Sequence, residues 1–197
     1  METNKNEMQE VINEGNSLMR KFPGFVTSEI EELTKELKLE ERPPVVVFGK
    51  PARQNRNVGF FSDESIGYRY SGTIMKSQPL PGWLKERMAR VNETLETNFN
   101  GVLVNHYTSG DDYIGAHSDD EKSLGNGSKV AMISFGAVRK FRIRSKETKK
   151  IVIDVPTTPM ALFTMEGDFQ KKFTHEIPVE KKIKEQRWSL TFRRHLE

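Results

Sequence analysis

The sequence contains no cysteine, and this absence excludes disulfide bonds, thiolate metal sites and cysteine nucleophiles. It also lacks an apolar run of membrane-spanning length, and residues 1–7 lack the apolar segment of a signal peptide. Hydrophobic residues make up 35% of the chain and charged residues 30%, a balance typical of a globular protein rather than a disordered one. We therefore expect a soluble protein that works inside the cell and not in a membrane.

Charge is distributed unevenly along the 197 residues, a length that fits one compact domain with a sizeable core. The net charge is only +3, yet residues 1–41 carry ten acidic and five basic side chains, so the remainder carries +8. Residues 139–150 hold seven bases against one acid. A basic surface of this kind suits a polyanion such as nucleic acid. A solvated hairpin with outward-pointing charges would explain the same pattern.

Helical and extended patterns alternate in the first hundred residues. Residues 1–25 are polar with a weak helical spacing, which predicts a loose tail or a docked helix. A clearer helix is predicted from Ser28, because Ser28 and Glu31 fit a capping box. Another helix is predicted over 81–96, where apolar side chains recur at core-facing spacing. The intervening predictions are a strand at 45–48, a loop rich in Asn, Arg and Gly at 49–59, and a strand at 67–75.

From residue 101 the chain changes to short β-rich runs separated by turn residues. Many evenly spaced short strands favour a β-sandwich or a barrel. Helices followed by strands give an α+β arrangement in which the helices buttress one sheet. The predicted strands cover residues 102–107, 130–135, 140–144, 151–155, 161–165, 173–177 and 187–193.

Three residues are candidate metal ligands. His117 and Asp119 are two positions apart, so on an extended segment both side chains point the same way and can reach one ion. His175, 56 residues after Asp119, lies in another β-rich run and is the candidate third ligand. Two histidines and a carboxylate form the facial ligand set of non-haem iron oxygenases. Zinc accepts the same set, and an isolated His-x-Asp is often a surface or hydrogen-bonded histidine.

The segment 187–193 alternates polar and apolar side chains, so one face of the predicted strand is polar and the other is an apolar wall. The polar face consists of Arg187, Ser189, Thr191 and Arg193. Buried arginines are costly unless they meet anions, and a dicarboxylate cosubstrate would satisfy them. The α-carbons of the two arginines lie roughly 20 Å apart at about 3.3 Å per residue. Either both side chains lean toward one small dicarboxylate, or one binds it while the other pairs with Asp119. A strand with a charged outer face would show the same alternation.

In this order, the motifs resemble the AlkB family of iron(II)- and 2-oxoglutarate-dependent dioxygenases. The resemblance spans residues 43–194 and is carried by Asn105-His106-Tyr107, His117-x-Asp119, His175 and the strand 187–193. The blocks 117–121 and 130–136 also resemble the family. The family fold is a double-stranded β-helix, a jelly-roll barrel, which agrees with the strand count. The resemblance thus implies a jelly-roll core over 101–197, buttressed by the N-terminal helices and a nucleotide-recognition lid of residues 26–100.

The resemblance also implies the chemistry and the ligands. His117, Asp119 and His175 would bind iron(II). Arg187 would pair with the distal carboxylate of 2-oxoglutarate, and Arg193 would lie nearer the metal. The other residues implied to surround 2-oxoglutarate are Asn105, Tyr107, Ser189 and Thr191. Oxygen and 2-oxoglutarate would be consumed, succinate and carbon dioxide released, and an N-alkyl carbon of a DNA or RNA base hydroxylated and lost as an aldehyde.

The substrate contacts implied by the resemblance lie outside this ligand set. Tyr70, with Tyr68 as its neighbour, would stack on a flipped base. Glu121 would contact a cationic lesion such as 1-methyladenine or 3-methylcytosine. Phe48 would fill the gap left by the flipped base, although it fits a core position equally well. Arg53 belongs to a basic loop that suits a lid over nucleic acid.

Two departures from the family are visible. The basic loop at 146–150 is shorter than in relatives that grip duplex DNA, which weakens any expectation of duplex preference, and His106 stands where relatives often have arginine. We expect a monomer that acts on alkylated DNA or RNA. Two alternatives are an oxygenase of the same fold that hydroxylates a protein or small molecule, and a non-catalytic nucleic-acid binding module.

Overall fold

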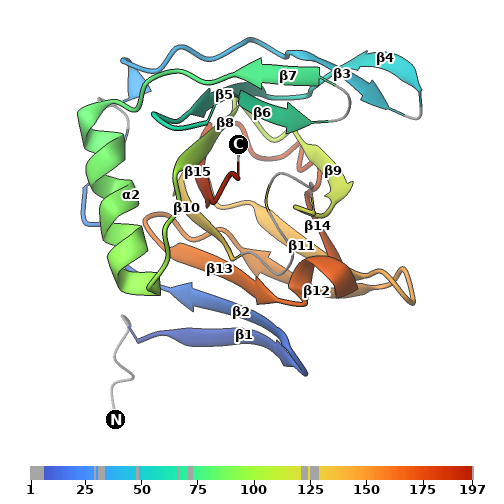
Figure 1. The fold of residues 1–197 in the computed structure, drawn as a ribbon. Helices are drawn as coiled ribbons and strands as arrows, with labels where there is room; N and C mark the ends of the chain where they lie inside the picture. The colour runs from blue at the N-terminus through green and yellow to red at the C-terminus, as the bar shows by residue number, and fades with distance from the viewer. Residues whose placement is uncertain are drawn as a thin grey trace.

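The computed structural model describes residues 7–28, 30, 34–47, 49–65, 67–70, 73–120, 124 and 129–196. Two antiparallel sheets face each other and together form a barrel (Figure 1). The large sheet contains, in spatial order, β1 (Gln9–Glu14), β2 (Ser17–Phe22), β13 (Leu162–Gly167), β10 (Val130–Gly136), β15 (Arg187–Arg193), β8 (Gly101–Tyr107) and β5 (Asn57–Phe61). The small sheet contains β12 (Ile151–Pro156), β11 (Lys140–Ser145), β14 (Phe173–Ile177) and β9 (Ile114–His117).

The chain alternates between the two sheets as it passes through the barrel. From β8 to β11 successive strands belong to the large and the small sheet in turn, and the alternation resumes from β12 to β15. Two hairpins lie over one end of the barrel, β3 (Pro44–Val47) with β4 (Lys50–Arg53), and β6 (Gly67–Tyr70) with β7 (Thr73–Lys76) (Figure 1). The predicted jelly-roll core is confirmed, and with it all seven strands predicted after residue 101.

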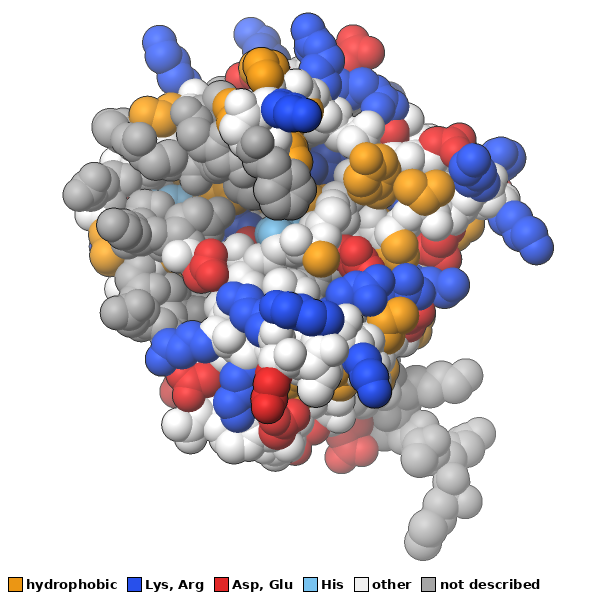
Figure 2. Space-filling model, turned by 90° about the vertical axis from the view of Figure 1, so that its right-hand side faces the viewer, with side chains coloured by type: hydrophobic (Ala, Val, Ile, Leu, Met, Phe, Trp, Pro, Cys, Tyr) orange, Lys and Arg blue, Asp and Glu red, His pale blue; other side chains and the backbone are white. Residues whose placement is uncertain are grey.

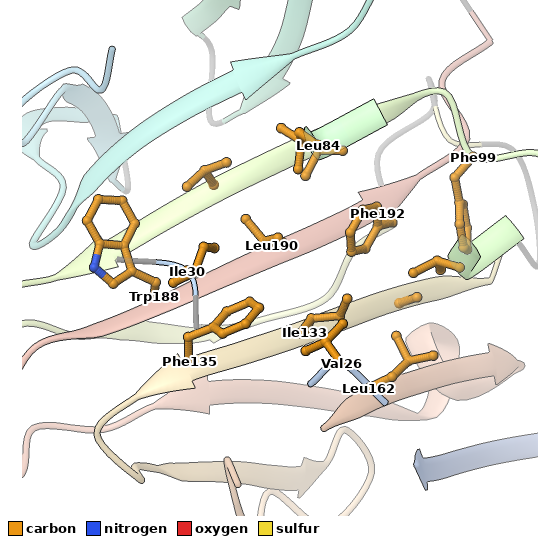
Figure 3. Close-up of a cluster of buried hydrophobic side chains, with 14 of the residues drawn as sticks. Val26, Ile30, Leu84, Phe99, Ile133, Phe135, Leu162, Trp188, Leu190 and Phe192 are labelled. Carbon is orange, nitrogen blue, oxygen red and sulfur yellow. The ribbon is translucent and has the colours of Figure 1, made fainter. Parts of the chain in front are cut away.

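The helix α2 (Gly82–Leu95) covers the outer face of the large sheet. Its buried side chains Leu84, Val91 and Leu95 recur at helical spacing, which is the pattern that predicted a helix over 81–96. They belong to one hydrophobic cluster with the apolar face of β15 (Figure 3). The residues that β15 supplies to this cluster are Trp188, Leu190 and Phe192. The apolar side chains of β15 therefore pack in one cluster with α2. The polar side chains of the same strand face the barrel interior.

The N-terminal segment corrects one expectation. Residues 9–22 form the hairpin β1–β2, which extends the large sheet beyond β13, in place of a loose tail or a docked helix. Gly15 adopts a left-handed φ of 60° at the turn, and Met19 of β2 is fully buried. The free edge of β13 supplies hydrogen-bond partners to β2, and such long-range pairing overrides a weak local helical pattern. The sequence signals for this hairpin were Gly15 at the turn and the alternate positions 17 and 19 of β2, which are buried.

Residues 26–100 correct two more expectations. The predicted loop at 49–59 contains β4 and the start of β5, and the predicted strand at 67–75 is the hairpin β6–β7. All four residues of β4 are exposed, so no apolar alternation marked it as a strand. The strand predicted at 45–48 is confirmed as β3, with Phe48 itself outside the described residues. The helix predicted from Ser28 also falls largely outside them, although the Thr34 N–H donates to the Ile30 carbonyl.

A short helix, α3 (Phe169–Lys172), connects β13 to β14. Within the described ranges, no helix is long and apolar enough to cross a membrane.

The packing of α2 on β15 predicts the cost of a core truncation. Leu190→Ala removes a fully buried side chain and should lower the free energy of unfolding by about 2–5 kcal/mol, because a cavity remains between helix and sheet. Urea denaturation followed by circular dichroism measures this. The matched control Val138→Ala truncates a side chain that is 49% exposed and should change the value by no more than about 0.5 kcal/mol. Equal losses in both variants would contradict the assigned packing.

Candidate active site

Two strands of the small sheet bring the three candidate metal ligands together. His117 ends β9, Asp119 follows two residues later, and His175 lies in β14 directly opposite His117 in the strand register. One ligand atom from each lies within 4.8 Å of the others. The Nε2 atoms of His117 and His175 are each 3.8 Å from a different oxygen of Asp119. The geometry leaves room between these atoms for one metal ion.

Hydrogen bonds fix the orientation of this group. Nδ1 of His117 lies 2.8 Å from the Gly115 carbonyl, so it carries the proton and leaves Nε2 free for a metal. The backbone N–H of Asp119 donates to Oε1 of Gln170, and the Ser118 hydroxyl donates to the Phe173 carbonyl. These contacts hold the segment 117–119 against α3 and the start of β14. Gln170 was not anticipated from the sequence, because only the fold brings α3 beside Asp119.

The protonation states suit metal binding. Burial, together with the positive charge of the neighbouring His117, lowers the pKa of His175 to about 3. Burial also lowers the pKa of His117, against the opposing effect of Asp119. For Asp119, burial favours the neutral acid, but the charge and hydrogen bond of Arg193 together with the two histidines outweigh burial and hold the pKa of the carboxyl well below its usual range. At neutral pH the group therefore presents two neutral imidazoles and one carboxylate, the states in which these side chains coordinate a metal.

The two arginines of β15 have different partners. Arg193 donates to Oδ1 of Asp119 at 2.5 Å, with both side chains buried. Arg187 is fully buried at the other end of the strand, where its Nε donates to the Ser134 hydroxyl and its guanidinium lies 5.1 Å from the centre of the Tyr107 ring. Of the two arrangements open from the sequence, the structure therefore shows the one in which a single arginine pairs with Asp119.

Arg187 retains an unused donor. Its Nη1 is buried and meets no hydrogen-bond acceptor among the described residues. Burial lowers the pKa of Arg187 to about 10, so it still carries its charge at neutral pH. A buried N–H without an acceptor is costly, and a carboxylate would satisfy both the donor and the charge. The residue thus fits one end of a dicarboxylate whose other end reaches the metal.

A single cavity connects Arg187 to the metal ligands. It contains about 490 Å³ of space, including its open mouth. All six residues predicted to surround 2-oxoglutarate line it, namely Asn105, Tyr107, Arg187, Ser189, Thr191 and Arg193. Arg56 and Met132 also line it and were not predicted for this cavity. The sequence placed Arg56 in the basic loop of residues 49–59 that suits a nucleic-acid lid, because nothing local to that segment shows that β5 pairs with β8.

The predicted substrate residues divide into three groups. Tyr68 of β6 is buried and lines the cavity, with its ring centre 5.1 Å from the Arg193 guanidinium. Arg53 of β4 is exposed, donates to the Arg42 carbonyl, and lines an open groove that also reaches His117. The remaining predictions, Phe48, Glu121 and the side chain of Tyr70, lie outside the described residues. In Figure 2 a histidine side chain is visible in a hollow, with a band of Lys and Arg side chains beside it.

The basic run at 139–150 is less available than its composition indicated. Arg139 is fully buried and donates to backbone carbonyls, including those of Ser109, Asp112 and Pro178. Most of the others pair with acids: Arg142 with Asp154, Arg144 with Glu176, Lys146 with Asp120 and Lys140 with Glu180. Within the part of the chain that the structure describes, only Lys149 and Lys150 of this run lack an acidic partner. The excess positive charge is therefore concentrated at the tip of the β11–β12 hairpin.

A two-histidine, one-carboxylate group beside a buried cationic cavity, on a jelly-roll barrel, defines the class of non-haem iron oxygenases. Comparison with known proteins agrees. The model of the 2OG-Fe(II) oxygenase superfamily matches residues 19–193. Human DNA oxidative demethylase ALKBH2 is 32% identical over 185 residues, covering 87% of this chain and 71% of that protein. Mouse alpha-ketoglutarate-dependent dioxygenase alkB homolog 3 is 31% identical, covering 87% and 64%.

The chain therefore belongs to the 2OG-Fe(II) oxygenase superfamily and, within it, to the AlkB family. Iron(II), 2-oxoglutarate and oxygen are the cofactor and cosubstrates of this family, and the ligand set and cavity described above fit the first two. Solved structures share the fold. One titled "The structure of OsALKBH1" aligns with a TM-score of 0.63 at 15% identity, covering 95% of this chain and all of that one. A 2OG-Fe(II) oxygenase family oxidoreductase from Burkholderia pseudomallei aligns with a TM-score of 0.54 at 14% identity, covering 92% and 86%.

The ligand geometry predicts a selective loss of metal affinity. His175→Ala removes one of three ligands and should weaken Mn(II) binding at least about 10- to 100-fold, a loss of the size that altered metal shells produce. Isothermal titration with Mn(II) under nitrogen measures the affinity directly. His106→Ala is the matched control, because His106 stacks on Trp188 with ring centres 3.9 Å apart and does not belong to the ligand group. Unchanged affinity in His175→Ala would remove this residue from the metal site.

Proposed function

We propose that this protein removes alkyl groups from damaged nucleic-acid bases by oxidation. Its substrates would be lesions of the 1-methyladenine and 3-methylcytosine type in DNA or RNA, and its products the restored base, formaldehyde, succinate and carbon dioxide. The relatives named DNA oxidative demethylase ALKBH2 support this substrate class. When bound, iron(II) supplies the oxidative chemistry with 2-oxoglutarate and oxygen, while the protein supplies placement and electrostatics. We expect it to act as an intracellular monomer.

The observation that carries the proposal is the position of His117 between two spaces. This residue lines the enclosed cavity that fits 2-oxoglutarate, and it also lines the open groove beside the β3–β4 hairpin. A substrate in the groove therefore reaches the metal site without displacing the cosubstrate. The groove walls combine apolar side chains, such as Val46, with the cations Arg53 and Arg56. This mixture suits the bases and the phosphates of a nucleic acid.

The residues take separate roles in this proposal. His117, Asp119 and His175 hold iron(II), and Arg187 binds the distal carboxylate of 2-oxoglutarate. Arg193 keeps Asp119 ionised at the metal end of the cavity. Asn105, Tyr107, Ser189 and Thr191 complete the cosubstrate contacts.

A second set of residues would contact the substrate. We assign Tyr68 and Tyr70 to stacking on the flipped base, Arg53 to a backbone phosphate, Glu121 to the cationic base and Phe48 to the gap in the stack. The assignment of Tyr68 is supported by its place in the cavity lining, and that of Arg53 by its place in the groove. The others rest on sequence resemblance.

A turnover assay tests the function. With iron(II), 2-oxoglutarate and ascorbate, the wild-type protein should release formaldehyde and restore the base in oligonucleotides that carry 1-methyladenine or 3-methylcytosine. His117→Ala should abolish both signals, because the metal loses a ligand. Single-stranded DNA, duplex DNA and RNA with the same lesion should be run in parallel to rank them.

The outcomes of this assay separate the candidate functions. Decarboxylation of 2-oxoglutarate without repair of any oligonucleotide would overturn the proposal in favour of an oxygenase that acts on a protein or small molecule. Binding of oligonucleotides without decarboxylation would indicate a non-catalytic module.

The unused donor of Arg187 predicts a change in cosubstrate affinity. Arg187→Lys keeps the charge but loses the fork of N–H donors, so the KM for 2-oxoglutarate should rise about 10- to 100-fold, the equivalent of one charge-assisted hydrogen bond. Titration of 2-oxoglutarate in the decarboxylation assay measures KM. The control Arg144→Lys makes the same exchange at a residue paired with Glu176 on the small sheet. A KM that stays constant in both variants would place the distal carboxylate elsewhere.

A further inference from the structure

A buried arginine lies at the junction between the cosubstrate cavity and the substrate groove. Arg56, the residue before β5, is 4% exposed, and it lines both spaces. Arginine is rarely so buried without a partner. Its partner here is Asn105 of β8, because Nε of Arg56 donates to Oδ1 of the asparagine amide at 2.7 Å. The contact is enclosed on both sides, since Asn105 is itself buried.

This hydrogen bond determines which end of the Asn105 amide faces the cavity. An asparagine side chain carries an acceptor, Oδ1, and a donor group, Nδ2, on the same planar amide. With Oδ1 held by Arg56, the acceptor is engaged and only the N–H donors remain for a ligand in the cavity. The Asn105–Arg56 bond is the sole hydrogen bond to this side chain among the described residues. Without Arg56, nothing described would prevent the amide from turning its oxygen toward the cavity.

The orientation has a direct consequence for an anionic ligand. An N–H donor stabilises a carboxylate, whereas a carbonyl oxygen at the same position repels it. We propose that Arg56 is a positioning residue for the cosubstrate, which fixes the Asn105 amide so that its N–H donors meet a carboxylate of 2-oxoglutarate. The inference rests on the proposed function only for the identity of the ligand. It gives Arg56 a role toward the cosubstrate that no motif of the sequence indicated, and this role acts through Asn105.

A double-mutant cycle tests this coupling. The dissociation constant of 2-oxoglutarate is measured by isothermal titration with the Mn(II)-loaded protein under nitrogen, so that no turnover occurs. Arg56→Met should raise the dissociation constant about tenfold, the equivalent of one hydrogen bond. In the Asn105→Ala background the same change should raise it less than about twofold, because the amide to be oriented is gone.

Further variants separate positioning from charge. Arg56→Gln is neutral but keeps an N–H donor, and it should restore part of the affinity that Arg56→Met loses. Lys182→Met removes an exposed positive charge and should leave the dissociation constant unchanged. The thermal unfolding midpoint and Mn(II) affinity of each variant establish that the barrel and metal site are intact. Should Arg56→Met unfold the protein, Arg56→Ala carries the cycle in its place, because it also removes the donor to Asn105.

Three results would overturn the inference. An equal loss of affinity for Arg56→Met in both backgrounds would show that the residue acts by its charge and not through Asn105. An unchanged affinity in the wild-type background would show that it has no role in binding. A wild-type protein that binds Mn(II) but not 2-oxoglutarate would overturn the proposed cosubstrate site together with this inference, whereas the first two results leave the proposed function standing.

Discussion

The buried ion pair between Arg193 and Asp119 is the interaction on which the candidate metal site depends. It joins β15, in the middle of the large sheet, to the segment that follows β9 at the edge of the small sheet. Burial alone would favour a neutral carboxyl at Asp119, and a protonated acid is a poor metal ligand. The arginine keeps the carboxylate charged and fixes its position between His117 and His175. Removing either partner would leave an uncompensated buried charge, which typically costs about 3–5 kcal/mol.

The cavity beside this pair contains more positive charge than its own side chains neutralise. Arg56, Arg187 and Arg193 all line it, and Asp119 is the one carboxylate among the lining residues. Of the three, Arg193 is balanced by Asp119, Arg56 by a neutral amide oxygen, and Arg187 by a hydroxyl and an aromatic face. Such an arrangement is stable when a ligand supplies the missing negative charge. A bound metal ion would increase the need for negative charge in the cavity. A dianionic cosubstrate therefore suits the cavity better than a neutral one.

The sequence predicts those elements whose structure follows from a local repeat of apolar and polar side chains. In β15 the alternation of two faces predicted both the apolar surface against α2 and the polar lining of the cavity, because neighbouring side chains of a strand point in opposite directions. The same rule placed His117 and Asp119 on one side, and helical spacing predicted α2 within one residue at each end. Reasoning failed at β4, where every side chain is exposed, and at β1–β2, where pairing with β13 decides the conformation.

The sequence by itself therefore determined the barrel strands other than β9, the three candidate metal ligands and the polar residues that line the cavity beside them. Only the tertiary structure showed that Arg193 is the arginine that pairs with Asp119. It also showed that Arg56 donates to the Asn105 side chain and that Gln170 accepts from the Asp119 backbone. The physical reason is the same in each case. Periodicity fixes the direction of a side chain relative to its own strand. The partner of a buried polar group is chosen by contacts between segments 49 to 74 residues apart, which no local pattern encodes.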